Sequence, residues 1–135
     1  MVSFEGEIKD VTPPNYFEAP FMLKHGSKYY LMYSDGKVID TTYKVRYSIG
    51  DTPFGPWTEG KNSPILSTTR DSITVSPGHH TVFVEGGQHY ILYHRHSKRS
   101  SGGTDGLLRE LCIDSLNFTP EGFIRRIGSK GVAGY

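Results

Sequence analysis

One carboxylate in an apolar segment is the residue of this chain best suited to proton transfer. Glu18 is the only charged residue in the eight-residue run YFEAPFML, from Tyr16 to Leu23. Such a run predicts a buried strand, where a carboxylate is costly unless it is paired, hydrogen-bonded or protonated. A carboxyl group in apolar surroundings has a raised pKa, which suits a general acid near neutral pH. The alternative is a core glutamate that pairs with an Arg or Lys.

The composition favours an all-β domain. Nine Tyr, seven Phe and sixteen Gly among 135 residues favour strands joined by tight turns, and no helical period of useful length is present. The chain has the length of one domain. Fifteen basic and fourteen acidic residues give a formal net charge of +1, so the charge suggests neither nucleic acid nor a membrane surface as a partner.

The single cysteine and the hydropathy pattern exclude other classes. Cys112 alone allows no internal disulfide and no Cys-rich zinc site. No apolar run is long enough to cross a membrane, and the first residues do not resemble a secretion signal. The cellular compartment therefore stays open.

A sixty-residue repeat organises the chain. The segment GSKYYLMYS, which begins at Gly26, aligns without a gap with GGQHYILYH, which begins at Gly86. An apolar strand precedes each copy, and an alternating strand follows it. A short fourth strand is expected near Trp57 to Glu59 and near Phe123 to Arg126. A repeated four-stranded antiparallel unit is typical of a β-propeller blade.

The repeat predicts two blades, residues 16–60 and 77–128, with residues 1–12 as the outer strand of a preceding blade. A propeller needs about four blades to close, and an open pair exposes apolar surface. We therefore expect a homo-oligomer, or a chain that needs N-terminal blades it lacks.

The repeat also gives Glu18 a partner. With one residue of slack in the hairpin, Glu18 and His79 take equivalent places at the start of the innermost strand. Innermost strands surround the central channel of a propeller, so both side chains are expected to point into one polar cavity. Two ionisable groups at matched positions favour a functional Glu18.

The chain resembles glycoside hydrolase family 43, the five-bladed arabinanases, arabinofuranosidases and xylosidases. The resemblance runs through essentially the whole chain in the family's order and spacing, and corresponds to about the last two of five blades. The segments that carry it are FEAPF from Phe17, KYYLMYS from Lys28, YKVRYS from Tyr43, DTPFGPW from Asp51, NSPIL from Asn62, PGHH from Pro77, YILYHR from Tyr90, and residues 109–123.

This resemblance implies roles for individual residues. Glu18 corresponds to the family's general acid, and the substrate is expected to be an arabinose- or xylose-containing oligosaccharide. His79 corresponds to a histidine at the channel floor that in many members helps to hold a calcium ion or a water cluster. Arg109 matches a family arginine that can reach the active site, although it could instead pair with a strand carboxylate.

Aromatic residues beside Glu18 are candidates for substrate contact. Tyr16 and Phe17, with Phe21 and Trp57, could form a platform for sugar rings. Packing between blades is the alternative, and it suits Trp57 better than Tyr16.

The resemblance also implies that part of the machinery is missing. The family's general base and a second aspartate come from earlier blades, and nothing in residues 1–17 resembles either segment. An inverting glycosidase needs two carboxyl groups roughly 6.5–9.5 Å apart, so the isolated chain is expected to be a poor catalyst. A non-catalytic carbohydrate-binding or structural propeller fragment is the competing interpretation.

Histidine pairs suggest a transition-metal site as a further alternative. His79 and His80 are adjacent, and His94 and His96 could share a face of one strand. Neighbours on a strand point to opposite faces, and zinc needs three or four convergent ligands. Support of calcium by His79, or a hydrogen bond in the channel, is therefore preferred.

Overall fold

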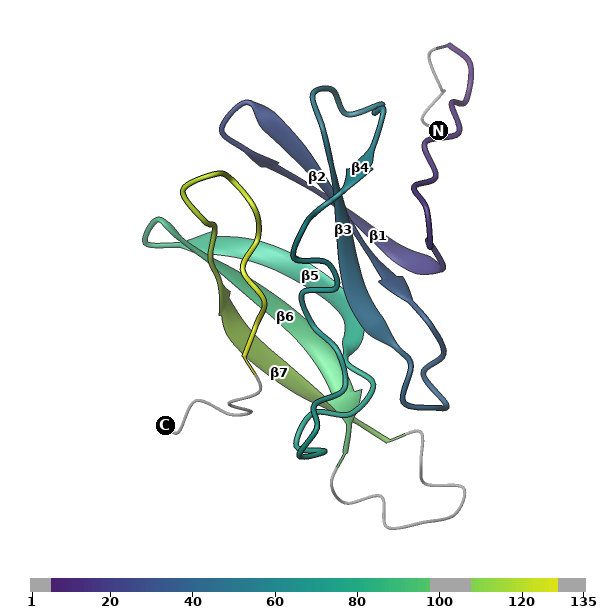
Figure 1. Ribbon diagram of the computed structural model, residues 1–135, viewed down its shortest axis with the longest axis vertical. Helices are drawn as coiled ribbons and strands as arrows, with labels where there is room; N and C mark the ends of the chain where they lie inside the picture. Colours follow the sequence, from purple (N-terminus) through teal and green to yellow (C-terminus); the bar gives the residue numbers. More distant parts are fainter. Residues whose placement is uncertain (1–5, 98–107, 129–135) are drawn as a thin grey trace, which may run out of the picture.

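The computed structural model describes residues 6–97 and 108–128, which form two antiparallel sheets lying against each other (Figure 1). The first sheet has the strand order β1 (Glu18–His25), β2 (Lys28–Asp35), β3 (Lys44–Gly50) and β4 (Thr58–Glu59). The second sheet has the order β5 (Gly78–Glu85), β6 (Gln88–His96) and β7 (Arg109–Leu116). The predicted all-β antiparallel class is confirmed. Within the described ranges no helix is long and apolar enough to cross a membrane.

Two tight turns give both sheets the same first hairpin. His25 pairs with Lys28, and sixty residues later Glu85 pairs with Gln88. The turns contain Gly26 at φ 60° and the Gly86-Gly87 pair at 57° and 79°. Glycine adopts this left-handed conformation without steric cost. The repeat seen in the sequence is thus a repeat in the backbone.

Both innermost strands also carry the same irregularity. The register shifts between Glu18 and Phe21 in β1, and between Gly78 and Thr81 in β5. Ala19 and His79, sixty positions apart, have φ angles of 55° and 52°. The residue equivalent to Glu18 is therefore Gly78, and His79 is equivalent to Ala19. The predicted equivalence of Glu18 and His79 is one residue in error.

The core lies between the two sheets. Its buried hydrophobic cluster is formed by Tyr30, Met32, Val45, Tyr47, Ile65, Leu66, Val82, Ile91, Tyr93, Leu116 and Ile124. A hydrogen bond from the Tyr30 hydroxyl to the carbonyl of Gly122, 2.6 Å long, links the sheets at one end. Contacts of β5 with β1, β2 and β3 link them at the other. This packing brings the beginnings of β1 and β5 together.

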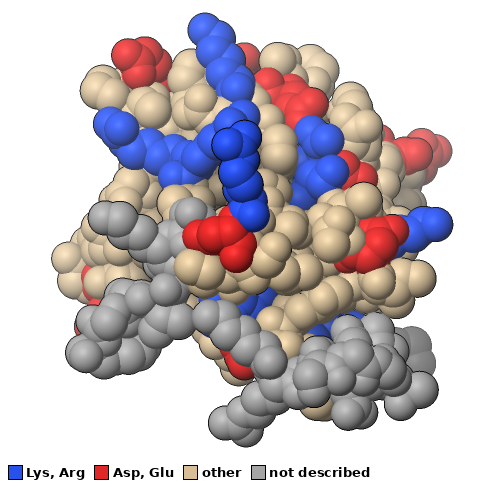
Figure 2. Space-filling model, turned by 60° about the horizontal axis from the view of Figure 1, so that its bottom comes forward, with Lys and Arg blue, Asp and Glu red and all other residues tan. Residues whose placement is uncertain are grey.

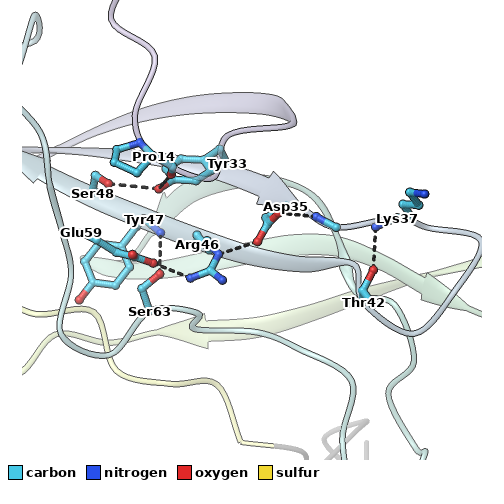
Figure 3. A network of polar contacts seen from close by, with 11 residues as sticks. Pro14, Tyr33, Asp35, Lys37, Thr42, Arg46, Tyr47, Ser48, Glu59 and Ser63 are labelled. Carbon is cyan, nitrogen blue, oxygen red and sulfur yellow. Dashed lines mark hydrogen bonds and ion pairs between the residues drawn. The ribbon is translucent and has the colours of Figure 1, made fainter.

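A polar network covers the other face of the first sheet (Figure 3). The Arg46 guanidinium lies 2.7 Å from Asp35 and 2.6 Å from Glu59, which ties β3 to β2 and β4. Nearby, the Tyr33 hydroxyl donates to the carbonyl of Pro14 over 2.9 Å. The chain before β1 is thereby held against this sheet. Basic and acidic side chains both occur on the face shown in Figure 2.

The chain lacks a paired strand at the end of the second unit and in the described residues before the first. The predicted fourth strand near Phe123 to Arg126 is wrong, because only a single bridge between Phe118 and Ile124 forms there. The intervening residues close a tight loop, in which the Gly122 amide donates to the carbonyl of Thr119 over 2.9 Å. The expected outer strand at 1–12 lies partly outside the described residues, and its described part, 6–12, is not paired as a strand.

Candidate functional site

Glu18 opens β1 at the edge of the first sheet. Its side chain is 42% exposed, so the prediction of a buried carboxylate is wrong. The apolar residues Phe17 and Met22 are exposed as well, at 59% and 40%. Glu18 is therefore a carboxylate that a ligand can reach from solvent.

Two residues contact the same oxygen of Glu18. The Tyr43 hydroxyl donates a hydrogen bond to Oε1, and Nδ1 of His79 lies 3.6 Å from Oε1. The backbone amide of His79 donates to Oγ of Ser34 over 2.9 Å, and Ser34 is the register partner of Glu18. The predicted meeting of Glu18 and His79 thus occurs, although their positions in the repeat differ.

Tyr43 packs its ring against the second sheet and donates a hydrogen bond from its hydroxyl to Glu18 of the first sheet. It lies just before β3 and is 1% exposed. Its ring is nearly parallel to that of His94, with centroids 5.8 Å apart and an interplanar angle of 7°. It also fills the space beside Gly78, where a Cβ atom would lie 2.1 Å from its Cε1. Burial, followed by the hydrogen bond to Glu18, raises the pKa of Tyr43 to about 12, so the hydroxyl remains a donor at neutral pH.

His94 forms an uncharged wall of this cluster. Burial, followed by the positive charge of Arg109, lowers the pKa of His94 to about 4. Its Nδ1 is buried without a hydrogen-bond partner in the described part of the chain, and its ring centroid lies 6.1 Å from that of His79. A neutral His94 can stack on Tyr43 without adding charge near Glu18.

Arg109 borders the cluster from β7. It is exposed, and its charge favours the anionic form of Tyr43 and disfavours protonation of His94. On the neighbouring strand, Arg95 lies 3.3 Å from Glu110, and the pairing of Arg109 with a strand carboxylate stays an alternative. Arg109 is thus placed beside the candidate site, and its contact with substrate stays a prediction.

The two aromatic candidates lie in different surroundings. Tyr16 is 36% exposed and packs on Tyr33 with ring centroids 5.9 Å apart. Phe17 is 59% exposed, and its amide donates to the carbonyl of Ser34 over 3.1 Å. Both directly precede Glu18 in the chain, and a role in substrate contact stays a prediction for each.

The residues around His79 do not by themselves form a metal site. His79 and His80 point to opposite faces, with the side chain of His79 60% exposed and His80 6% exposed. In residues 6–97 and 108–128, no three His, Cys, Asp or Glu side chains converge to hold a metal ion. Calcium takes six to eight oxygen ligands, so its support by His79 would need oxygen atoms from elsewhere and stays a prediction.

Sequence reasoning did not identify Tyr43 and Gly78 as parts of the site, and it considered His94 only as a metal ligand. A signal for Gly78 was present, because the sixty-residue offset aligns it with Glu18. No pattern within the chain showed that Tyr43 turns toward the other sheet.

Comparison with known proteins supports one family throughout. The model of glycosyl hydrolases family 43 matches residues 1–124. The chain is 37% identical over 125 residues to the β-D-galactofuranosidase XynD of Aspergillus niger, covering 92% of this chain and 35% of that protein. It is 32% identical to a β-xylosidase of Xylanibacter ruminicola, covering 85% and 32%. The chain thus spans about a third of the length of these relatives.

Solved structures agree with this assignment. A thermostable family-43 glycoside hydrolase superposes with a TM-score of 0.70 at 34% identity, covering 87% of this chain and 39% of that one. A xylan β-1,4-xylosidase from Bacillus halodurans has a TM-score of 0.75 at 20% identity, covering 90% and 24%, which shows a shared fold. The two sheets match part of the propellers of these enzymes, and the chain belongs to glycosyl hydrolases family 43.

Proposed function

We propose that this chain forms the acid-bearing, C-terminal part of a glycosidase that cleaves α-L-arabinofuranosyl or β-D-xylosyl linkages of plant polysaccharides by inversion, with Glu18 as the general acid. The observation that supports this most is the state of Glu18. In a chain of this family, a 42% exposed carboxylate is held on one oxygen by the hydroxyl of Tyr43. A positioned carboxyl group open to a ligand is what proton donation to a leaving oxygen requires.

The two oxygens of Glu18 have different environments. Oε1 accepts from Tyr43 and lies 3.6 Å from Nδ1 of His79, so Oε2 is the oxygen left to carry the proton. When Oε2 protonates the glycosidic oxygen, the C–O bond breaks and Glu18 becomes a carboxylate. The hydrogen bond from the Tyr43 hydroxyl would stabilise that charge.

The general base is assigned outside this chain. Four other carboxylates of this chain are candidates for the general base, and each already interacts with a neighbouring residue. Asp10 accepts from Thr12, Asp35 pairs with Arg46, Asp40 accepts from Thr42, and Asp71 accepts from Ile73. Inversion needs a second carboxyl group roughly 6.5–9.5 Å from the first. We infer that it comes from the part of such a domain that these 135 residues do not span, and that this chain alone is a poor catalyst.

Substrate contacts are assigned to residues around Glu18. Arg109 would donate hydrogen bonds to sugar hydroxyls, and Tyr16 and Phe17 would contact the apolar face of a sugar ring. Relatives bear the names β-xylosidase, xylosidase/arabinosidase and β-D-galactofuranosidase, so a galactofuranosyl linkage belongs among the substrates tested.

The test compares two glutamates in the full chain. Because this chain alone is a poor catalyst, the slow hydrolysis of phenyl glycosides of arabinofuranose, xylopyranose and galactofuranose is measured at high protein concentration with the wild type, Glu18→Gln and Glu85→Gln. Glu85 ends β5 and is exposed, so its variant controls for the loss of one charge. Loss of this hydrolysis in Glu18→Gln alone supports the proposal, whereas equal and measurable hydrolysis by all three proteins contradicts it. Binding of these sugars by the wild type without any cleavage would support the carbohydrate-binding alternative instead.

A further inference from the structure

We propose that Tyr43 is a positioning residue for Glu18, and that Gly78 and His94 of the second sheet in turn position Tyr43. This inference rests on the proposed role of Glu18 as general acid. It adds that the orientation of the acid depends on how the two sheets pack.

The path of the side chain supports this role. Tyr43 belongs to the first sheet's β2–β3 connection, yet its ring stacks on His94 of β6, with an angle of 7° between the rings. The hydroxyl of the same ring donates a hydrogen bond to Oε1 of Glu18, on β1 of the first sheet. A displacement of the second sheet would therefore move the donor that fixes the carboxylate.

Gly78 explains why the ring fits. Its φ lies outside the left-handed region, so its backbone conformation does not require glycine. A Cβ atom at this position would instead lie 2.1 Å from Cε1 and 2.5 Å from Cδ1 of Tyr43. Where the first sheet carries the side chain of Glu18, the second sheet carries none, and the Tyr43 ring occupies the space.

His94 is the second residue that holds the Tyr43 ring, and its own ring is neutral. Protonation of His94 is opposed by burial and by the nearby charge of Arg109. The parallel stack therefore keeps Tyr43 flat against His94 across neutral pH. The hydroxyl direction is fixed by the stack on one face and by Gly78 beside it.

The first test measures the contact without turnover. The phenol of Tyr43 is titrated by NMR in the full chain labelled at tyrosine Cζ. The pKa of about 12 should fall in Glu18→Gln, because the carboxylate acceptor is lost, and stay above the usual value because burial remains. It should fall further toward 10 in Gly78→Ala, which displaces the ring. Tyr30→Phe, which removes the hydrogen bond to Gly122, is the control and should leave it unchanged. An unchanged Tyr43 titration in Glu18→Gln overturns the proposal.

The second test separates positioning from a structural role. Proton donation matters most for a poor leaving group, so phenyl and dinitrophenyl glycosides are compared. Tyr43→Phe keeps the ring and should slow the phenyl glycoside by about tenfold more than the dinitrophenyl one, a fraction of a general acid's usual contribution. Tyr30→Phe should affect both substrates equally.

The outcomes also keep the two proposals apart. If Tyr43→Phe behaves like Tyr30→Phe while Glu18→Gln abolishes cleavage of the phenyl glycoside, Tyr43 is structural and the positioning proposal is wrong. If Glu18→Gln cleaves both substrates normally while the Tyr43 titration still moves, the contact is real and the proposed acid is wrong. A Tyr43→Phe effect confined to the phenyl glycoside supports positioning.

Discussion

Nδ1 of His79 lies 3.6 Å from Oε1 of Glu18, although the two residues begin the inner strands of different sheets. The approach depends on the paired bulges, because His79 and its equivalent Ala19 adopt φ angles of 52° and 55°. Bulges re-aim side chains where strand pairing is interrupted. One ionisable group from each sheet is thereby directed to the same point.

Acid should destabilise the protein through His80. This residue is 6% exposed, and neither ring nitrogen has a hydrogen-bond partner among the described residues. Burial, followed by the charge of His79, lowers the pKa of His80 from 6.5 to about 4. The unfolded chain thus binds more protons between these values, so stability falls as pH drops from 6.5 to 4. The loss is about 3 kcal/mol, measured by urea unfolding across this range.

The variant His80→Phe isolates this contribution. It should reduce the pH dependence of the unfolding free energy between pH 6.5 and 4 by about half, because His94, whose pKa burial also lowers to about 4, still contributes to the slope. His79→Gln, at an exposed neighbour, is the matched control and should keep most of the slope. An equally steep slope in His80→Phe would show that other groups cause the acid loss.

The Arg46 network should matter more than an exposed ion pair. Arg46→Met leaves Asp35 and Glu59 without their shared cation, and side chains in this network are only 20–33% exposed. We expect a loss of about 2 kcal/mol in the free energy of unfolding. Lys28→Met removes the pair with Asp51, whose side chains are 49% and 80% exposed, and should change stability little. Similar losses in urea unfolding would contradict this ranking.

Gly60 should tolerate no side chain. A Cβ atom there would lie 2.0 Å from Cζ of the buried Tyr47 ring. Gly60→Ala should therefore cost about 2 kcal/mol through overpacking. Gly128→Ala is the control, because nothing lies within 4 Å of its Cβ position. Equal midpoints of thermal unfolding for the two variants would contradict this prediction, because they would mean that Tyr47 can move aside at little cost in stability.

The repeat predicted the two sheets because backbone pairing and turn chemistry are local. The Gly26 and Gly86-Gly87 turns, with the strands beside them, could be located from sixty-residue self-similarity alone. The fourth strand of the second unit could not, because the loop around Gly122 draws the chain back to a single bridge.

The environment of the site was less predictable. Glu18 was expected to be buried because its neighbours are apolar, but an edge strand exposes such residues when no further element covers them. Tyr43 was missed because its partners, Gly78 and His94, lie in the other sheet. Contacts between sheets depend on packing, which leaves no period in the sequence.

The most direct measurement is the leaving-group dependence of hydrolysis by Glu18→Gln. If Glu18 donates the proton, this variant should lose about a hundredfold or more of the rate on a phenyl glycoside and much less on a dinitrophenyl glycoside. The reason is that a dinitrophenolate departs without protonation. Equal losses on both substrates, or no loss on either, would contradict the assignment of Glu18 as the general acid.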